Sequence, residues 1–97
     1  MPTTDTLGPV LLALARQAIA KALGVPAPEA PDHPELAKRG ASFVTLTEHG
    51  ELRGCIGSLN AHRALGEDVR ANAVAAALND SRFSPLTAAE FKDVKVE

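Results

Sequence analysis

The stretch LRGCIG, residues Leu52–Gly57, is the segment around which we expect the chain to fold and to place its chemistry. It holds the only cysteine, Cys55, between two glycines, with Arg53 two positions before it. The apolar residues Leu52 and Ile56 frame the cysteine, so the segment fits a β-strand. The glycines leave space beside the sulfur for a backbone or a ligand. In a regular strand, Arg53 and Cys55 point to the same face.

Two interpretations of this stretch stay open. A guanidinium close to a thiol favours the thiolate, which is the nucleophilic form, so Cys55 is a candidate nucleophile. A lone cysteine between apolar residues is most often a small buried hydrophobe, and glycines in a strand often mark only a bulge. The spacing by itself favours this second, structural interpretation.

The residues before this stretch predict its partner strand. Ala41–Thr47 is rich in β-branched and aromatic residues, which is typical of a strand. Glu48–Glu51 reads as a tight turn in which Gly50 supplies a positive φ. The sequence therefore predicts an antiparallel hairpin over residues 41–57. Its register is not fixed, because a slip of one residue exchanges the two faces.

Helices are predicted on both sides of the hairpin. Apolar residues between positions 7 and 23 recur at steps of three and four, and an alanine-rich stripe runs from about Leu65 to Leu78. Between them, residues 25–38 are rich in proline and are expected to form a strap over the core or a flexible linker. His33 lies in this segment, and we expect it to face solvent.

The C-terminal residues carry two further signals. Thr87 and Glu90 have the spacing of a capping box, so a helical turn is expected to start there. Residues 94–97 alternate apolar and polar side chains, which is typical of a strand. In the preceding loop, Arg82 is expected to pair with Asp80 or to reach a ligand.

Composition limits the class of protein. The chain has 97 residues, of which 45% are hydrophobic, which suits one small α+β domain or part of one. Its formal net charge of −2 argues against nucleic-acid binding through bulk positive charge. The single cysteine cannot form an internal disulfide, the N-terminus has no basic flank of a signal peptide, and no apolar run suits a membrane span. We therefore expect a cytoplasmic protein.

Polar residues just beyond the cysteine strand complete a candidate site. His62 is the best available base, so Cys55 and His62 are the candidate catalytic pair. The single cysteine and scattered histidines show no spacing of a structural zinc site, and the sequence does not tell which cofactor, if any, the protein uses. The candidate substrate-binding residues are Arg53, Gly54, Gly57, Ser58, Asn60 and Arg82.

Three segments together resemble a known family. They are GASFVTL at residues 40–46, GELRGCIGSL at residues 50–59 and DSRFSPLT at residues 80–87. In order and spacing they resemble the AMMECR family, named after the AMME chromosomal region, whose bacterial and archaeal members form protein A of the AmmeMemoRadiSam system. The resemblance covers nearly the whole chain.

The resemblance implies an α+β domain with a mainly antiparallel sheet and helices packed on it. It also implies genomic association with Memo-type and radical SAM proteins, which are the expected partners. The arginine and cysteine of the family motif correspond to Arg53 and Cys55, and its DSRF-type loop corresponds to residues 80–83. No reaction follows from the family.

Two functional hypotheses follow. In the first, the protein is an enzyme or enzyme subunit of a modification pathway that uses Cys55 as nucleophile or carrier thiol. In the second, it is a non-catalytic module whose glycines shape a groove for a ligand or protein. Family domains continue past this length, so we expect residues 1–97 to be the N-terminal portion of one domain. An open sheet edge then predicts self-association.

Overall fold

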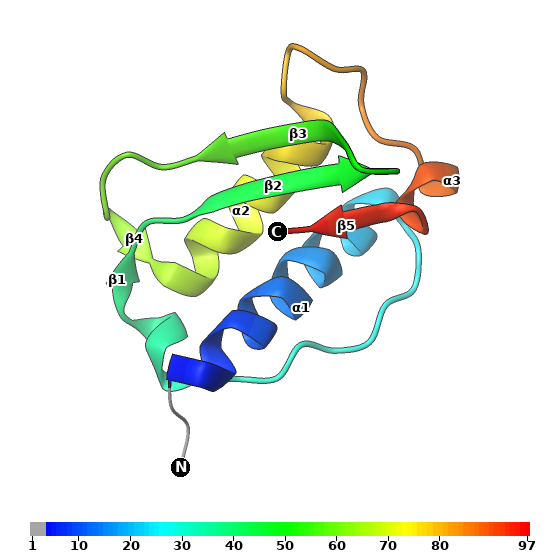
Figure 1. Ribbon diagram of the computed structural model, residues 1–97. Coiled ribbons are helices and arrows are strands. Elements are labelled where there is room, and N and C mark those ends of the chain that lie inside the picture. Colours follow the sequence, from blue (N-terminus) through cyan, green and yellow to red (C-terminus); the bar gives the residue numbers. More distant parts are fainter. Residues whose placement is uncertain (1–3) are drawn as a thin grey trace.

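The computed structural model describes residues 4–97 and has the α+β architecture expected from the sequence (Figure 1). The first helix, α1, spans Thr4–Leu23 and ends where Gly24 adopts a φ of 74°, which costs glycine little because it has no Cβ. The second long helix, α2, spans Leu65–Leu78, as its alanine-rich stripe predicts. None of the helices within residues 4–97 combines the length and the apolar character that a membrane crossing needs.

A three-stranded antiparallel sheet contains the predicted hairpin. Strands β2 (Phe43–Glu48) and β3 (Glu51–Gly57) are its two arms, and β5 (Val94–Val96) pairs with the other edge of β2. The turn residues His49 and Gly50 have φ angles of 53° and 81°, as in the primed turns that match the twist of a hairpin. The strand order is therefore β3-β2-β5.

The structure supplies the register that the sequence left open. Thr45 lies opposite Cys55, and Phe43 lies opposite Gly57. Leu46, which points to the other face, is fully buried against the helices. Figure 1 shows both long helices on one side of this sheet. Cys55 therefore lies on the face that no helix of residues 4–97 covers, and it shares this face with Phe43.

The proline-rich segment runs back along α1 from its C-terminal end (Figure 1). It places Val25, Ala27 and Ala30 against the core. His33, expected in solvent, is only 6% exposed, so that expectation is wrong. The histidine caps the short 3₁₀ helix η1 (Pro34–Ala37), because its Nδ1 accepts a hydrogen bond from the backbone N–H of Glu35 at 3.1 Å.

The last helix, α3, spans Ala88–Phe91 and begins with the predicted capping box of Thr87 and Glu90. Arg16 of α1 fixes this end of the chain. Its Nη1 donates to the carbonyl of Val94 at 2.8 Å, and its Nη2 donates to the carbonyl of the last α3 residue at 3.0 Å. Its guanidinium also lies 4.1 Å from the ring centroid of that residue. These contacts hold β5 beside β2.

A small-residue core joins the helices to the sheet. The strand pair β1 (Arg39–Gly40) and β4 (Arg63–Ala64) closes one end of the molecule. The core between α1, α2 and the sheet is formed by Leu14, Ala15, Ile19, Ala20, Val44, Leu46, Val69, Ala73, Ala76, Ala77, Leu86, Phe91 and Val94.

A buried carboxylate ties the ends of the hairpin to α2. Asp68 is fully buried, and its Oδ2 accepts hydrogen bonds from the N–H and the hydroxyl of Ser42, each at 2.7 Å. Its Oδ1 accepts from the hydroxyl of Ser58 at 2.6 Å and from Nε of Arg63 at 2.8 Å. The side-chain amide of Asn72 also donates to Oδ2, at 3.0 Å. Burial alone raises the pKa of Asp68, but these hydrogen bonds outweigh it and lower the pKa to about 2.

Candidate functional site

The loop after α2 closes the free edge of the cysteine strand. Strand β3 is an edge strand, so Cys55 has backbone groups that β2 does not pair. Asp80 accepts the N–H of Cys55 at 3.1 Å through Oδ2, and Nη2 of Arg82 lies 3.4 Å from the carbonyl oxygen of Cys55. The two side chains thus take the place of a neighbouring strand and protect this edge from further pairing.

Asp80 and Arg82 form the predicted ion pair. Nε and Nη2 of Arg82 donate to the two carboxylate oxygens of Asp80 at 3.0 and 2.7 Å, and the N–H of Arg82 donates to Oδ1 at 3.1 Å. The hydrogen bond from Arg82, followed by that from the N–H of Cys55, holds the pKa of Asp80 well below its usual range. The carboxylate therefore stays charged at neutral pH, where it orders the loop.

We expect Asp80→Ala to expose the amide of Cys55. Hydrogen exchange at this amide, followed by NMR, should accelerate on the order of tenfold, because the variant removes its acceptor. Arg82→Gln is the matched control, since it leaves the bond between Asp80 and Cys55 in place and should give a smaller change. Equal acceleration in both variants would contradict the assignment of Asp80 as the cap of this edge.

The sulfur of Cys55 has a hydroxyl as its neighbour. Sγ lies 3.4 Å from Oγ1 of Thr45, its cross-strand partner, and the cysteine is half-buried. Among the hydrogen bonds of residues 4–97, none joins the sulfur to a basic side chain. The arrangement therefore lacks the cysteine–base contact of a typical activated nucleophile.

Arg53 lies in a β-bulge, which the prediction of a regular strand did not include. Leu46 pairs with Gly54 and Thr47 pairs with Leu52, so Arg53 has no residue opposite it. Its guanidinium donates to both carboxylate oxygens of Glu90, each at 3.1 Å. The guanidinium of Arg53 is thus bound by Glu90, and among the hydrogen bonds of residues 4–97 none joins it to the sulfur of Cys55.

Two carboxylates and an aromatic ring surround the guanidinium of Arg53. Nε of Arg53 lies 3.7 Å from Oε1 of Glu48, and the ring centroid of Phe83 lies 5.9 Å from its central carbon. The hydrogen bond from Arg53 is the main cause that lowers the pKa of Glu90 to about 2, against the effect of burial. Burial, followed by the hydrogen bond and charge of Glu90, raises the pKa of Glu48. This cluster joins the β2–β3 hairpin to α3.

Both glycines of the motif have packing roles. A Cβ on Gly54 would lie 2.2 Å from the carbonyl oxygen of Ala76 in α2, so only glycine lets β3 approach the helix this closely. A Cβ on Gly57 would lie 2.1 Å from the ring of Phe43, which covers it on the open face. The space beside the sulfur that the glycines were expected to leave is thus occupied by the helix and the phenylalanine.

The other predicted site residues do not gather at the sulfur. Ser58 belongs to the hydrogen-bonded cluster around Asp68, at the end of β3. His62 is exposed, and its Nδ1 lies 3.0 Å from the carbonyl oxygen of Asn60. Within residues 4–97 no hydrogen bond links His62 to Cys55. Their catalytic pairing stays a prediction without a contact to support it.

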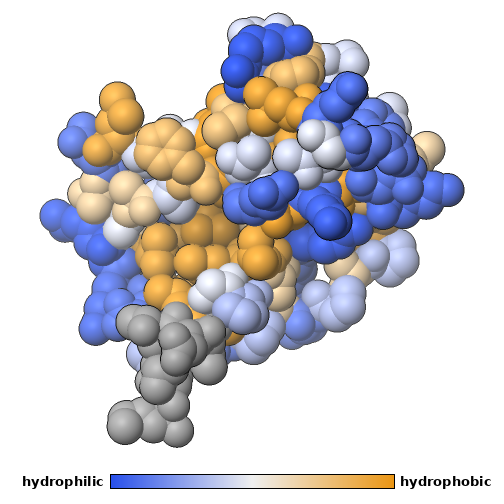
Figure 2. Space-filling view, in the orientation of Figure 1, coloured by the Kyte–Doolittle hydropathy of each residue, from blue (hydrophilic) through white to orange (hydrophobic). Residues whose placement is uncertain are grey.

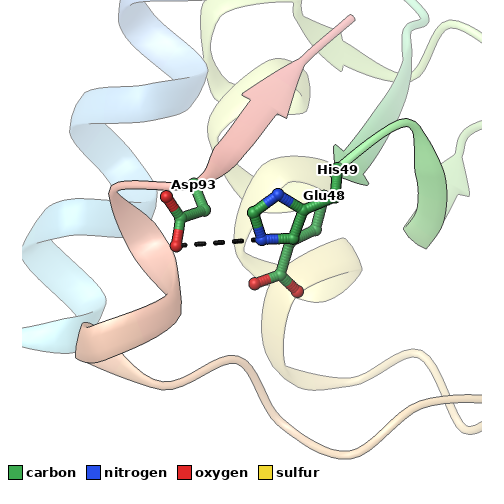
Figure 3. Close-up of side chains that lie close together, drawn as sticks. All are labelled: Glu48, His49 and Asp93. Atoms are coloured by element: carbon green, nitrogen blue, oxygen red, sulfur yellow. Dashed lines mark ion pairs between the residues drawn. The ribbon is translucent and has the colours of Figure 1, made fainter.

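The structure also groups three side chains that the sequence analysis did not bring together. Ligand atoms of Glu48, His49 and Asp93 lie within 4.8 Å of one another. Figure 3 shows His49 and Asp93 facing each other. They form an ion pair in which Nε2 of His49 lies 4.0 Å from Oδ2 of Asp93. Asp93 reaches the hairpin because Val94 pairs with Glu48, a long-range contact that spacing does not reveal. A carboxylate also faces Arg53 here, so we describe the group as an ion-pair cluster at the hairpin turn.

These features define an α+β domain in which an edge strand carries a half-buried cysteine and an Asp-Arg loop closes the edge. The family model AMMECR1 matches residues 12–97, and the chain therefore belongs to the AMMECR1 family. This match confirms the resemblance that the sequence motifs indicated.

Relatives and a solved structure agree with this assignment. A protein of Sulfolobus acidocaldarius is 46% identical over 69 residues, which cover 67% of this chain and 30% of the relative. A protein of Methanosarcina acetivorans is 37% identical over 100 residues, which cover 97% of this chain and 50% of the relative. The crystal structure of the uncharacterized protein PH0010 from Pyrococcus horikoshii superposes with a TM-score of 0.78 at 33% identity, over 89% of this chain and 46% of that one. The chain spans about half the length, or less, of the curated relatives it matches.

Proposed function

We propose that this chain is a non-catalytic binding module, and that its partner contacts the open face of the sheet around Cys55. The observation that carries this proposal is a row of exposed apolar side chains on that face. Phe43 is 63% exposed and Leu52 is 45% exposed, and they lie on either side of the half-buried cysteine. Exposed apolar side chains gathered on one face of a small domain are typical of an interaction surface.

The surroundings of the motif support binding over chemistry. Glu90 holds the guanidinium of Arg53, and the neighbour of the sulfur is the hydroxyl of Thr45. A guanidinium and a hydroxyl are not general bases, so neither Arg53 nor Thr45 supplies the base that an activated cysteine nucleophile needs. Cys55 therefore serves as a small apolar contact in the middle of the surface.

The proposed partners are the Memo-type and radical SAM proteins that the family resemblance implies. In this proposal the module binds one of these proteins, or the substrate of one of them, within a modification pathway. The exposed side chains of Phe43 and Leu52 lead us to expect a partner that offers apolar side chains to this face.

The enzyme hypothesis remains as a second candidate because of one observation. The side chain of Arg82 is 56% exposed to solvent, and its Nη2 lies 3.4 Å from the carbonyl oxygen of Cys55. An anionic substrate held by this guanidinium would approach the cysteine strand. In this version Arg82, in place of Arg53, is the substrate-binding cation, and Cys55 is the nucleophile or carrier thiol.

A binding experiment with matched variants tests the proposal. The chain is titrated against the purified Memo-type and radical SAM proteins of the organism that encodes it. We expect Leu52→Glu to weaken binding by about tenfold or more, because it places a charge in the apolar row. Leu59→Glu is the control, because Leu59 is 89% exposed in the loop beyond β3 and lies outside the row. Equal binding by wild type and Leu52→Glu, or no binding of the wild type, would overturn the proposal.

The cysteine separates the two candidates. For a binding module, Cys55→Ala should retain the affinity within about threefold, and iodoacetamide should alkylate the wild-type thiol no faster than it alkylates a free cysteine peptide. Alkylation many times faster than the peptide, together with loss of a pathway activity in Cys55→Ser, would instead support the thiol chemistry.

A further inference from the structure

The ion-pair cluster at the hairpin turn has the composition of a metal site. Its imidazole and its two carboxylates come from His49, Glu48 and Asp93, with ligand atoms within 4.8 Å of one another. Figure 3 shows the two hairpin residues on one side and Asp93 on the other. Imidazole nitrogen is a ligand that first-row transition metals accept, whereas Mg²⁺ and Ca²⁺ prefer a shell of oxygen atoms. The mixed set therefore suits a divalent transition-metal ion.

The backbone fixes the positions of all three residues. Glu48 is the last residue of β2 and pairs with Val94 of β5. His49 follows it in the turn with a φ of 53°. Asp93 directly precedes β5, and its N–H donates to the carbonyl of Glu90 at 2.9 Å. Sheet pairing thus brings ligands from two distant segments to one place, as a preorganised site requires.

The spacing of the ligand atoms fits an ion after a small movement. At 4.0 Å, Nε2 of His49 and Oδ2 of Asp93 are too far apart for a hydrogen bond. In residues 4–97 neither side chain forms a hydrogen bond with any other group. Because Zn–N and Zn–O bonds are about 2.0–2.2 Å long, two atoms bound to one Zn²⁺ lie about 3–3.5 Å apart. The two side chains therefore need to approach each other by less than about 1 Å.

The site is open to solvent, so this movement is possible. The side chains of His49 and Asp93 are 74% and 40% exposed. Figure 2 shows mostly hydrophilic surface over the end of the molecule where the hairpin turn and α3 lie. Lys95 and Glu97 also lie beside these residues, and their opposite charges offset each other. An ion and its water ligands can thus reach the cluster.

The charges at the cluster favour a cation. The guanidinium of Arg53 is bound to Glu90 by two hydrogen bonds, and its Nε also lies 3.7 Å from Oε1 of Glu48. One positive charge therefore faces two carboxylates, and Asp93 adds a third carboxylate next to Glu48. A divalent cation compensates the negative charge that Arg53 leaves.

We propose that Glu48, His49 and Asp93 bind a divalent transition-metal ion of the Zn²⁺ type, and that water completes its coordination. The carboxylate of Glu48 has a second oxygen, so it can bind the ion while Oε1 stays near Arg53. The bound ion links the β2–β3 turn to the segment between α3 and β5. The inference does not depend on the proposed function, because none of the three ligands belongs to the apolar row of the open face.

Calorimetric titration of the chelator-treated chain with Zn²⁺ tests the site. We expect the wild type to bind one Zn²⁺ and His49→Gly to bind it at least about tenfold more weakly. Glycine accepts the positive φ at this position, so His49→Gly should fold, which far-UV circular dichroism verifies. His62→Ala is the matched control, because it removes an exposed histidine outside the cluster. The proposal is overturned if the wild type does not bind Zn²⁺ at millimolar concentration, or if the two histidine variants have the same affinity.

Three further measurements locate the ion. Cys55→Ala should keep the affinity for Zn²⁺, and its loss would place the ion at the only thiol of the chain and overturn the site. Mg²⁺ should bind at least about tenfold more weakly than Zn²⁺, and equal binding would overturn the role of His49. Saturating Zn²⁺ should raise the thermal midpoint of the wild type by several degrees, but not that of Asp93→Asn. An equal rise in both proteins would overturn the role of Asp93.

Discussion

Gly54→Ala is expected to destabilise the protein by about 3 kcal/mol or to prevent folding. The added Cβ would lie 2.2 Å from the carbonyl oxygen and 3.0 Å from the carbonyl carbon of Ala76. These are backbone atoms of α2, so the contact is relieved only if strand and helix separate. The free energy of unfolding from urea denaturation measures the effect.

The same substitution at two other glycines provides controls for this prediction. Gly8→Ala adds a Cβ that meets nothing within 4 Å on α1, and we expect it to stabilise the protein by roughly 0.5–1 kcal/mol. The three atoms nearest to a Cβ on Gly57 belong to the ring of Phe43, which is 63% exposed and can turn away, so the cost of Gly57→Ala should be smaller than that of Gly54→Ala. If Gly54→Ala were as stable as Gly57→Ala, the close approach of β3 to α2 would be wrong.

Local patterns predicted most of the secondary structure. The hairpin over residues 41–57, the helix at Leu65–Leu78 and the capping box of Thr87 and Glu90 are all present. Each depends on residues a few positions apart, such as the glycine that takes a positive φ in the turn or the side chain that accepts a helix N–H. Such signals are contained in a short window of sequence.

The partners of the motif residues were not predictable in the same way. Arg53 was expected beside Cys55, but a bulge and a carboxylate 37 positions later take its guanidinium to Glu90. The sequence identified Glu90 only as part of a capping box, but the same side chain caps α3 and binds Arg53. Likewise, Asp80 caps the edge of β3 through a bond to Cys55 that spans 25 positions. Register and loop placement decide these contacts, and neither follows from local spacing.

Two of the three family-like segments, residues 50–59 and 80–87, therefore depend on each other physically. The LRGCIG strand contains an edge and a bulged arginine, and the segment from Asp80 to Glu90 supplies a carboxylate that binds each of them. Phe83 lies between the two arginines, with ring-centroid distances of 5.9 Å to Arg53 and 5.4 Å to Arg82. Most polar residues of these segments thus have a role in stability. The half-buried sulfur of Cys55 and its exposed apolar neighbours have no such role, so we assign the function to them.

Asp68→Asn is expected to cost about 3 kcal/mol at pH 7, because it breaks a buried ion pair and turns an amide donor toward donors already present. The carboxylate accepts hydrogen bonds from Ser42, Ser58 and Arg63 with no exposure to solvent. An asparagine has the same shape but accepts through only one oxygen. Asp93→Asn is the matched control. Because Asp93 is 40% exposed in a 4.0 Å pair with His49, we expect that variant to lie within about 0.5 kcal/mol of wild type.

The difference in stability between wild type and Asp68→Asn should depend on pH. The pKa of Asp68 is about 2 in the folded protein, below its value in the unfolded chain. Its contribution is therefore complete above pH about 4 and is lost as pH falls toward 2, because the unfolded state then binds the proton more tightly. Urea denaturation at pH 7, 5, 4 and 3 should show a constant gap that narrows only in the acid range. The other carboxylates whose pKa is lowered by folding are present in both proteins, so their effects cancel in the stability difference. A difference that stays the same at every pH would show that Asp68→Asn loses stability through the shape of the side chain and not through its charge.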